Sequence, residues 1–373
     1  HLRFGKKPIK STYLIHKANF VACHNPSYVN KYNMVQELVD GGTFLLNCAW
    51  DMEGLEKHLP GQVKAFIANH NIKFYTIDGV KIGIETGMGP TRINTILQSA
   101  FFKLTGIIPE EQAIELMKAA AKATYGRKGD DVVQKNWAAI DAGAKQVVEV
   151  KVPESWKDAA DEGLFMAHAN HGAQDAQDFV NNIQCKINAQ EGNSLPVSAF
   201  KDYVDGTTPS GTAAYEKRGI AVNVPVWVPD NCIQCNRCAY VCPHAAIRPV
   251  AMTADETANA PEGIKTLPLT GMKDYTFTMT VSALDCTGCG SCANVCPGKK
   301  GVKALAMESL AAHEAEQKYF DYAAALPEKT DVVAKFKENT VKGSQFKKPL
   351  LEFSGACAGC GETPYPKLIT QLF

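Results

Sequence analysis

Ten of the thirteen cysteines in this chain fall into three tight groups. Two of these groups share the form C-x2-C-x2-C-x3-C-P and read NCIQCNRCAYVCPHAAI and DCTGCGSCANVCPGKKG. The two stretches match position by position at the cysteines and the proline, so they form an internal repeat. Disulfide frameworks spread their cysteines more widely, and the spacing therefore predicts metal centres in a reducing compartment.

The repeated run is the one that holds 4Fe-4S clusters in bacterial ferredoxins. Three thiolates on a tight loop reach one cluster, and the fourth cysteine, which precedes the proline, ligates the cluster of the other repeat. We expect cluster one to be held by Cys232, Cys235, Cys238 and Cys296. We expect cluster two to be held by Cys286, Cys289, Cys292 and Cys242.

Zinc is the main alternative metal, because pairs of cysteines at this spacing also bind zinc. Zinc needs only two such pairs, which gives no reason for a third cysteine at the same spacing or for the trailing Cys-Pro. Two complete copies of the run therefore favour iron and sulfur. Because two buried clusters that lie close together can pass single electrons, we predict electron transfer rather than a structural role.

The third group is the pair Cys357 and Cys360 in SGACAGCGETPY, and no second pair accompanies it within the chain. By themselves these residues suit a redox C-x-x-C motif, half of a zinc site or half of a cluster site about equally. Three further cysteines lie in apolar or mixed surroundings, where we expect buried or unbridged thiols. These are Cys23, Cys48 and Cys185.

The chain is long enough for several domains, since 373 residues exceed the usual size of one hydrophobic core. Residues 1–188 alternate apolar runs with helix-like stretches and predict an α/β domain. Residues 189–227 are rich in Gly, Thr, Ser and Pro and predict an extended linker. Residues 228–341 predict a two-cluster ferredoxin-like domain, and residues 342–373 the start of a further domain.

Two amphipathic helices are expected in the first part, over residues 93–104 and 109–126, because their apolar residues recur at helical spacing. In the cysteine-rich part, the two halves are separated by more residues than a minimal ferredoxin needs. We therefore expect an insertion between Arg248 and Thr280.

Composition points to no polyanionic partner. Lys plus Arg and Asp plus Glu both total 39, so no net charge attracts nucleic acid or an anionic membrane. No run of about eighteen apolar residues could span a bilayer, and we expect a soluble protein. The chain begins at His1 without a Met or a signal sequence, so we expect further residues before it and after Phe373.

Three segments resemble, in this order, the middle of single-chain pyruvate:ferredoxin (or flavodoxin) oxidoreductases. They are HLRFGKKPI, AAYEKRGIAVNVPVWVP followed by the double cysteine run, and EFSGACAGCGETPY. The resemblance covers essentially the whole chain. Its most specific markers are the Glu216-Lys217-Arg218 signature and the CAGCGETPY sequence.

The resemblance implies a homodimeric, cytoplasmic enzyme of anaerobic metabolism that converts pyruvate and coenzyme A to acetyl-CoA and carbon dioxide. Its cofactors would be thiamine diphosphate with Mg²⁺ and three 4Fe-4S clusters, and its electron acceptor would be ferredoxin or flavodoxin. The α/β domain would resemble the coenzyme A-binding domain, and the end of the chain would begin the thiamine diphosphate-binding domain.

The resemblance also implies roles for single residues. Cys357 and Cys360 match two of the four ligands of the cluster nearest to thiamine, and Glu362 matches a glutamate that contacts this cofactor. The alternative for Glu362 is an acid at the start of a helix, and we favour the cofactor role over it. Asn94 and Asn136 match residues that contact coenzyme A, whose amides they could bind as donor and acceptor, although both also suit ordinary polar helix positions.

Two other functions remain open from the sequence. One is a pure electron-transfer module, for which the CAGCGETPY end would have no use. The other is an oxidoreductase for a different 2-oxoacid. Those enzymes more often divide these domains among separate subunits, so the continuous order here favours pyruvate.

Overall fold

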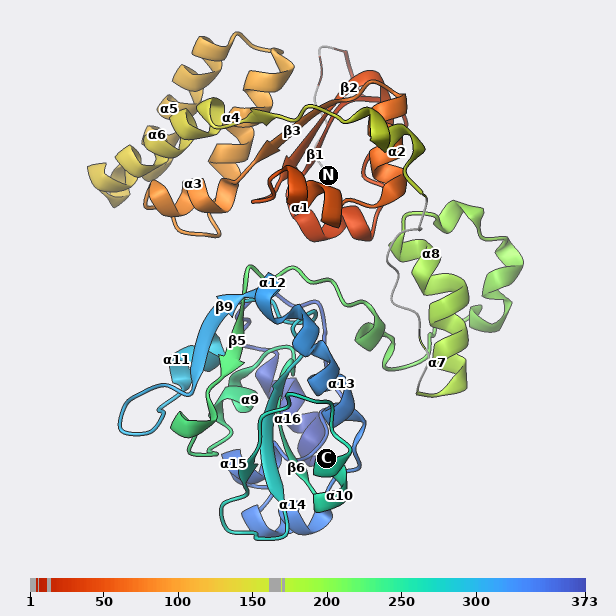
Figure 1. Ribbon diagram of the computed structural model, residues 1–373, viewed down its shortest axis with the longest axis vertical. Coiled ribbons are helices and arrows are strands. Elements are labelled where there is room, and N and C mark those ends of the chain that lie inside the picture. Colours follow the sequence, from red (N-terminus) through yellow and green to blue (C-terminus); the bar gives the residue numbers. More distant parts are fainter. Residues whose placement is uncertain (1–4, 6, 12–14, 161–168, 170–171) are drawn as a thin grey trace. The chain divides into compact units, whose positions relative to one another are not determined.

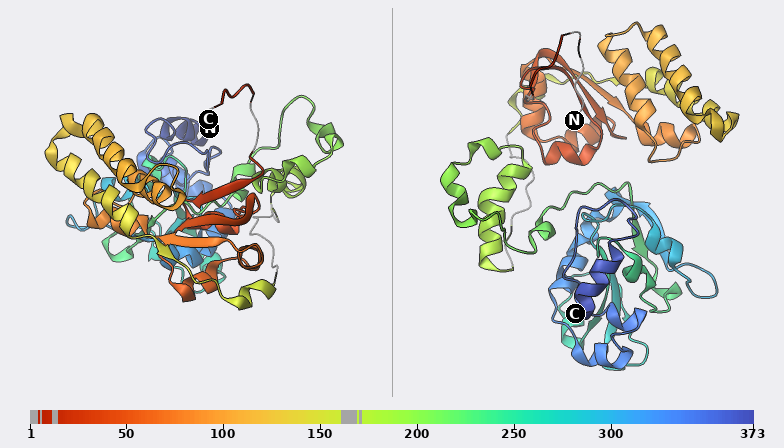
Figure 2. Two further views of the ribbon diagram at one scale, coloured as in Figure 1. Left: turned by 90° about the horizontal axis from the view of Figure 1, so that it is seen from above. Right: turned by 180° about the vertical axis from the view of Figure 1, so that it is seen from behind.

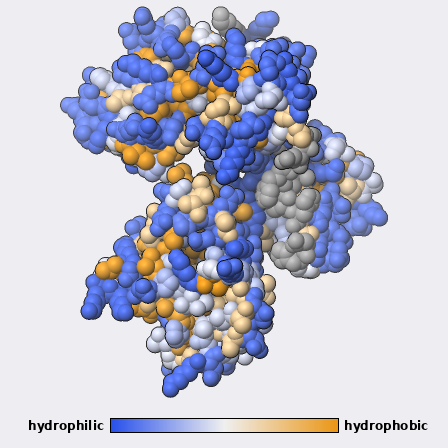
Figure 3. All heavy atoms as spheres, in the orientation of Figure 1, coloured by the Kyte–Doolittle hydropathy of each residue, from blue (hydrophilic) through white to orange (hydrophobic). Residues whose placement is uncertain are grey.

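The computed structural model describes residues 5, 7–11, 15–160, 169 and 172–373. The chain divides into two compact units, the first of residues 1–166 with 188–191, and the second of residues 167–187 with 192–373 (Figure 1). Our predicted boundary between the α/β domain and the linker lay at residue 188, and the four-part layout remains a prediction. Hydrophilic and hydrophobic residues are interspersed on the face shown in Figure 3.

The first unit is built on a four-stranded sheet in the order β1-β2-β3-β4. Its strands are Ala18–Cys23, Leu38–Asn47, Lys73–Ile77 and Val148–Glu149. Strands β1, β2 and β3 are parallel, and β4 joins β3 in the antiparallel direction. Figure 2 (left) shows β1, β2 and β3 side by side. The parallel strands fit the predicted α/β class.

Helices cover both faces of this sheet. The α-helices of the first unit are α1 (Met52–His58), α2 (Gly61–Asn69), α3 (Gly79–Glu85), α4 (Asn94–Thr105), α5 (Glu110–Tyr125) and α6 (Asp130–Lys145). Along β2, Phe44 and Leu46 enter one core with α1 and α2, while Leu45 enters the other core with α3 and α4. This alternation is the strand period of two. Helices α4 and α5 lie where the sequence predicted helices.

The second unit combines two antiparallel sheets with short helices. Strand β5 (Asn223–Trp227) pairs with β9 (Leu305–Ser309). Strand β6 (Ile247–Met252) pairs with β8 (Thr276–Val281), which also pairs with β7 (Leu267–Pro268). Strands β5 and β6 flank the first cysteine repeat, and β8 and β9 flank the second. The pairing of β5 with β9 and of β6 with β8 therefore joins the two repeats. The second unit is therefore α+β, with the two repeats interlocked.

Helices fill the connections of the second unit. They are α7 (Gln174–Phe179), α8 (Cys185–Asn188), α9 (Arg237–Val241), α10 (Ala254–Ala258), α11 (Ser291–Val295), α12 (Leu310–His313), α13 (Gln317–Ala325), α14 (Thr330–Phe336), α15 (Val341–Ser344) and α16 (Pro364–Leu372). A π-helical turn, Val180–Gln184, joins α7 to α8. The insertion expected between Arg248 and Thr280 contains α10 and β7. Within the described ranges, no helix is both long and apolar enough to cross a membrane.

The stretch expected to be an extended linker, residues 189–227, differs from the prediction at its end. It contains the 3-10 helices Gly192–Ser194, Val197–Tyr203 and Thr212–Tyr215 before β5. Val224 and Val226 of β5 are buried, so this strand belongs to the core of the second unit. Pro225 lacks an N–H and interrupts the usual strand pattern, which is why composition alone favoured a linker.

Candidate iron-sulfur site

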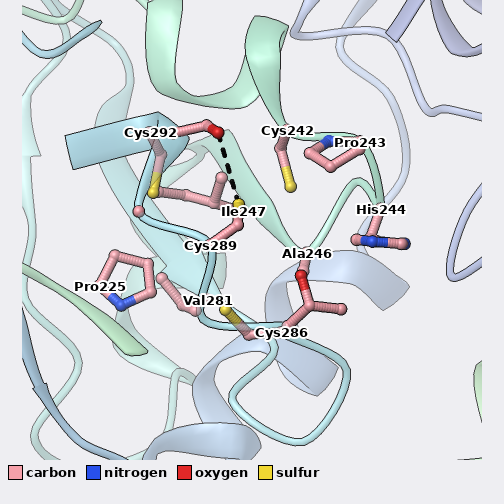
Figure 4. A pocket seen from close by; sticks show the side chains of 13 residues that line it. Pro225, Cys242, Pro243, His244, Ala246, Ile247, Val281, Cys286, Cys289 and Cys292 are labelled. Carbon is pink, nitrogen blue, oxygen red and sulfur yellow. Dashed lines mark hydrogen bonds between the residues drawn. The ribbon is translucent and has the colours of Figure 1, made fainter. Parts of the chain in front are cut away.

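The second cysteine cavity is lined by three thiols of the second repeat and one of the first. Cys286 and Cys289 come from the loop between β8 and α11, Cys292 lies in the first turn of α11, and Cys242 follows α9. Figure 4 shows the four side chains around the cavity, with His244 at its edge near Cys242. The empty volume is about 380 Å³. The structure thus brings together the four residues that the sequence grouped as cluster two.

The first cysteine cavity repeats this arrangement with the repeats exchanged. Cys232, Cys235 and Cys238 come from the first repeat, and Cys296 follows α11 of the second. The empty volume is about 340 Å³. In the part of the chain that the structure describes, no group of three or more His, Cys, Asp or Glu is arranged to hold a single metal ion. The thiols instead surround a space.

The two cysteine loops share an unusual backbone conformation. Gln234 and Asn236 of the first loop and Gly288 and Gly290 of the second lie at equivalent positions, and all four have left-handed φ angles between 55° and 74°. Glycine adopts this conformation without strain. At Gly288 a side chain would also be excluded by packing, because a Cβ there would lie 2.9 Å from the carbonyl oxygen of Asn223.

Hydrogen bonds hold the two non-glycine residues of the first loop in place. Gln234 donates to the carbonyl of Pro268 at 2.8 Å and accepts from the amide of Thr270 at 2.9 Å. Asn236 donates to the carbonyl of Lys342 at 2.9 Å. In the first repeat, these side-chain hydrogen bonds therefore stabilise the left-handed backbone conformation that glycine adopts without strain in the second repeat.

Backbone amides point at the cysteine sulfurs in both loops. The amide of Gln234 lies 3.4 Å from Sγ of Cys232, and the amide of Gly288 lies 3.4 Å from Sγ of Cys286. The amide of Ala304 lies 3.3 Å from Sγ of Cys296. Hydrogen bonds to cluster sulfurs are one way in which proteins set the reduction potential of a cluster.

The electrostatics of these thiols suit metal ligation. Burial raises the pKa of Cys286 and of Cys292 to about 12, and it raises the pKa of Cys232 and of Cys238 as well. A thiolate in such surroundings needs a cation beside it, and a bound metal supplies one while it keeps the ligand deprotonated. The donor set therefore fits iron.

Two further polar side chains face the cavities. Nε2 of His244, at the second cavity, is buried and has no hydrogen-bond partner among the described residues. At the first cavity, burial raises the pKa of the Cys232 thiol, and the nearby indole of Trp227 opposes this rise. Sulfide and thiolate sulfurs would accept hydrogen bonds from such groups, so both residues fit an iron-sulfur cluster. The sequence analysis singled out neither residue.

The loop with Cys357 and Cys360 packs against the second cysteine loop. A Cβ at Gly359 would lie 3.5 Å from the Cβ of Cys289 and 3.7 Å from the hydroxyl of Ser291. Hydrogen bonds from the side chain and the backbone of Thr363 lower the pKa of Cys360, which favours its thiolate. The third cysteine pair is therefore a direct neighbour of the second cavity.

The other expected site residues lie in separate places. Glu362 is exposed just before α16. Asn94 is exposed as the first residue of α4, whereas Asn136 is buried in α6, where it donates to the carbonyl of Val132 at 2.8 Å. Cys23, Cys48 and Cys185 are buried, as expected.

Comparisons with known proteins agree with the three marker segments. Residues 1–146 match the family described as pyruvate ferredoxin/flavodoxin oxidoreductase, and residues 231–300 match the 4Fe-4S dicluster domain. Residues 167–221 match the EKR family, described as a domain of unknown function. The dicluster match supports the expectation that 4Fe-4S clusters are bound in this region.

Curated relatives match the whole chain. It is 50% identical to the pyruvate-flavodoxin oxidoreductase of Enterobacter agglomerans over 373 residues, and 50% identical to the pyruvate:ferredoxin oxidoreductase of Moorella thermoacetica over 376 residues. Each match covers 100% of this chain and 31% of the relative. Among solved structures, pyruvate oxidoreductase subunit PORC of Thermotoga maritima matches at 18% identity with a TM-score of 0.30, over 37% of this chain and 67% of that one. The chain is thus related over its entire length to the pyruvate:ferredoxin and pyruvate-flavodoxin oxidoreductases, and it spans about a third of their length.

Proposed function

We propose that this chain is the electron-transferring and coenzyme A-binding part of a pyruvate:ferredoxin or pyruvate-flavodoxin oxidoreductase. The enzyme would oxidise and decarboxylate pyruvate with coenzyme A to give acetyl-CoA and carbon dioxide in the cytoplasm, as a homodimer. Two curated relatives are named as oxidoreductases of pyruvate, and they share half of their residues with this chain over the matched region. Their names also give the electron acceptor, ferredoxin or flavodoxin.

One observation supports this proposal most strongly. The loop of Cys357 and Cys360 touches the loop of Cys289, so a cluster bound by this pair would lie next to cluster two. Cluster two in turn shares its helices α9 and α11 with cluster one. Three neighbouring clusters would form a path for single electrons that ends at the acceptor protein.

The two cavities support the ligand sets that we propose for clusters one and two. Cluster one would be held by Cys232, Cys235, Cys238 and Cys296. Cluster two would be held by Cys242, Cys286, Cys289 and Cys292. Cys357 and Cys360 would supply two ligands of the third cluster.

The remaining assignments concern the organic groups. Thiamine diphosphate, with Mg²⁺, supplies the cleavage of the bond to the carboxylate when it is bound, and Glu362 would help to hold it. Glu362 is exposed next to the third cysteine pair, where its carboxylate is accessible. Asn94 and Asn136 would contact coenzyme A. The exposed amide of Asn94 is available for this, and Oδ1 of Asn136 has no hydrogen-bond partner among the described residues.

An experiment on the intact enzyme, prepared without oxygen, tests the proposal. Iron and acid-labile sulfide should each amount to about eight per chain from the region of the two cavities, in addition to the third cluster. Pyruvate with thiamine diphosphate and coenzyme A should then reduce the clusters, as followed by electron paramagnetic resonance.

Other outcomes would favour other functions. Zinc in place of iron would contradict the cluster assignment. Reduction by 2-oxoglutarate but not by pyruvate would favour another 2-oxoacid enzyme, and reduction by dithionite but by no 2-oxoacid would favour a pure electron-transfer module.

A further inference from the structure

The Glu216-Lys217-Arg218 segment lies against the loop that carries Cys286. Nζ of Lys217 is 2.6 Å from Oδ2 of Asp285, the residue before Cys286, and the two side chains are only 16% and 4% exposed. The hydroxyl of Ser282 also donates to Asp285 at 2.6 Å. Separating two charges in such a buried ion pair is costly, because each would lose its partner away from water. The ion pair therefore holds the backbone just before Cys286 in place.

Main-chain contacts next to the ion pair hold the same loop. The amide of Gly219 donates to the carbonyl of Leu284 at 2.7 Å. At the other side of Cys286, the carbonyl of Asn223 packs against Gly288 so closely that a Cβ would lie 2.9 Å from it. Residues 219–223 therefore contact the loop on both sides of the cysteine.

The same ammonium faces the segment that leads to Cys357. Nζ of Lys217 lies 5.1 Å from the centre of the Phe353 ring, and the guanidinium of Arg248 lies 5.6 Å from it. The amide of Phe353 donates to the carbonyl of His244 at 3.0 Å. Cations near an aromatic ring are attracted to its negative faces, so these two contacts favour one place for the segment before the third cysteine pair.

The backbone of Lys217 is itself unusual. Its φ is 41°, in the left-handed region that costs energy for a residue with a side chain. Such strain persists only where surrounding contacts determine the conformation, and it concentrates at functional sites. The two contacts of the ammonium, with Asp285 and Phe353, provide such surroundings.

We propose that Lys217 is a positioning residue for cluster two, which ties the Cys286 loop to the segment before Cys357 and raises the reduction potential of that cluster. Lys217 belongs to the segment that matches the EKR family, a domain of unknown function, and the proposal gives this segment a role. The proposal rests on the proposed iron-sulfur function. An electron added to cluster two is stabilised by a nearby cation and opposed by a nearby carboxylate. Lys217 and Asp285 should therefore act on the potential in opposite directions.

The test measures the midpoint potentials of both clusters in the intact enzyme by titration followed with electron paramagnetic resonance. Asp285→Asn removes the carboxylate and leaves the cation, so it should raise the potential of cluster two. Adding Lys217→Met to Asp285→Asn should lower the potential of cluster two again. The equilibrium constant for its one-electron reduction should fall at least tenfold, which corresponds to about 59 mV. Adding Lys217→Arg instead keeps the charge and should keep the potential high.

Cluster one and an exposed lysine serve as controls. The potential of cluster one should change less than that of cluster two in each variant, and Lys201→Met, in the same family match, should change neither. If the Asp285→Asn protein had the same cluster-two potential with and without the added Lys217→Met substitution, the inference would be overturned. Failure of the wild-type protein to hold cluster two would instead contradict the proposed function.

Discussion

Nζ of Lys367 donates a hydrogen bond to the carbonyl oxygen of Cys242 over 3.0 Å. The same ammonium also donates to the carbonyls of Ala239 at 2.5 Å and Tyr240 at 3.1 Å. These carbonyls lie at the end of α9, where that of Ala239 also accepts from the amide of Cys242 at 3.2 Å. Lys367 is 1% exposed, so α16 places a buried cation at the end of the helix that precedes a predicted cluster ligand.

Lys367→Met should destabilise the second unit, because the carbonyls of Tyr240 and Cys242 lose the buried ammonium as a donor. We expect the free energy of unfolding to fall by about 1–3 kcal/mol, measured by denaturant titration of the protein prepared without oxygen. Lys335→Met, at an exposed position of α14, is the control and should change it by less than about 0.5 kcal/mol. Equal effects of the two substitutions would show that the three hydrogen bonds contribute nothing.

The sequence predicted local features well and distant contacts poorly. The cysteine sets follow from a motif that occurs twice, and the helices α4 and α5 follow from periodicity within short stretches; the structure brings the cysteines of each set together and contains both helices. The hydrogen bond from Lys367 to Cys242 joins residues 125 positions apart, and that from Lys217 to Asp285 joins residues 68 apart. No periodicity marks such partners.

The strand β5 was missed for a local reason. Its Pro225 and the Gly- and Thr-rich residues before it are typical of a loop, whereas its buried valines and its pairing with β9 depend on a strand much later in the chain. Residues 223–227 thus form a strand because of their packing in the tertiary structure, although their composition is typical of a linker.

Gly288→Ala should damage the second cysteine loop more than Gly290→Ala does. Both glycines have left-handed φ angles, 69° and 74°, so both substitutions carry the same backbone cost of about 1–2 kcal/mol. Only Gly288 is crowded, since its Cβ would meet Asn223, whereas nothing lies within 4 Å at Gly290. Thermal unfolding of the two variants should therefore rank Gly288→Ala as the less stable, and the reverse ranking would argue against the close approach.

His313 should stabilise the protein mainly at mildly acidic pH. Hydrogen bonds to Glu316 and Glu308, at 3.0 and 2.8 Å, raise the pKa of His313 in the folded state. The free energy that protonated His313 contributes to folding is therefore fully present below the pKa of about 6.5 of the unfolded state. This contribution disappears as pH rises through the higher pKa of the folded state. His313→Gln should lower the free energy of unfolding by about 0.5–1 kcal/mol at about pH 5.5, with a much smaller loss at about pH 8.5. A loss that is equal at both pH values would exclude this linkage.

Asn94→Ala tests the coenzyme A assignment in the first unit. If the exposed amide of Asn94 binds coenzyme A, its loss should raise the KM for coenzyme A several-fold with little change in the KM for pyruvate. Gln98→Ala, also exposed and one turn further along α4, is the matched control. Steady-state kinetics with an unchanged coenzyme A dependence would leave Asn94 as an ordinary helix residue.

The exchange of the fourth cysteine between the repeats is the central structural claim, and one pair of variants tests it directly. Cys242 lines the cavity of the second repeat and Cys296 that of the first. Electron paramagnetic resonance of the dithionite-reduced protein should show cluster two altered or lost in Cys242→Ala, and cluster one altered or lost in Cys296→Ala. Loss of cluster one in Cys242→Ala, with cluster two intact, would contradict the account.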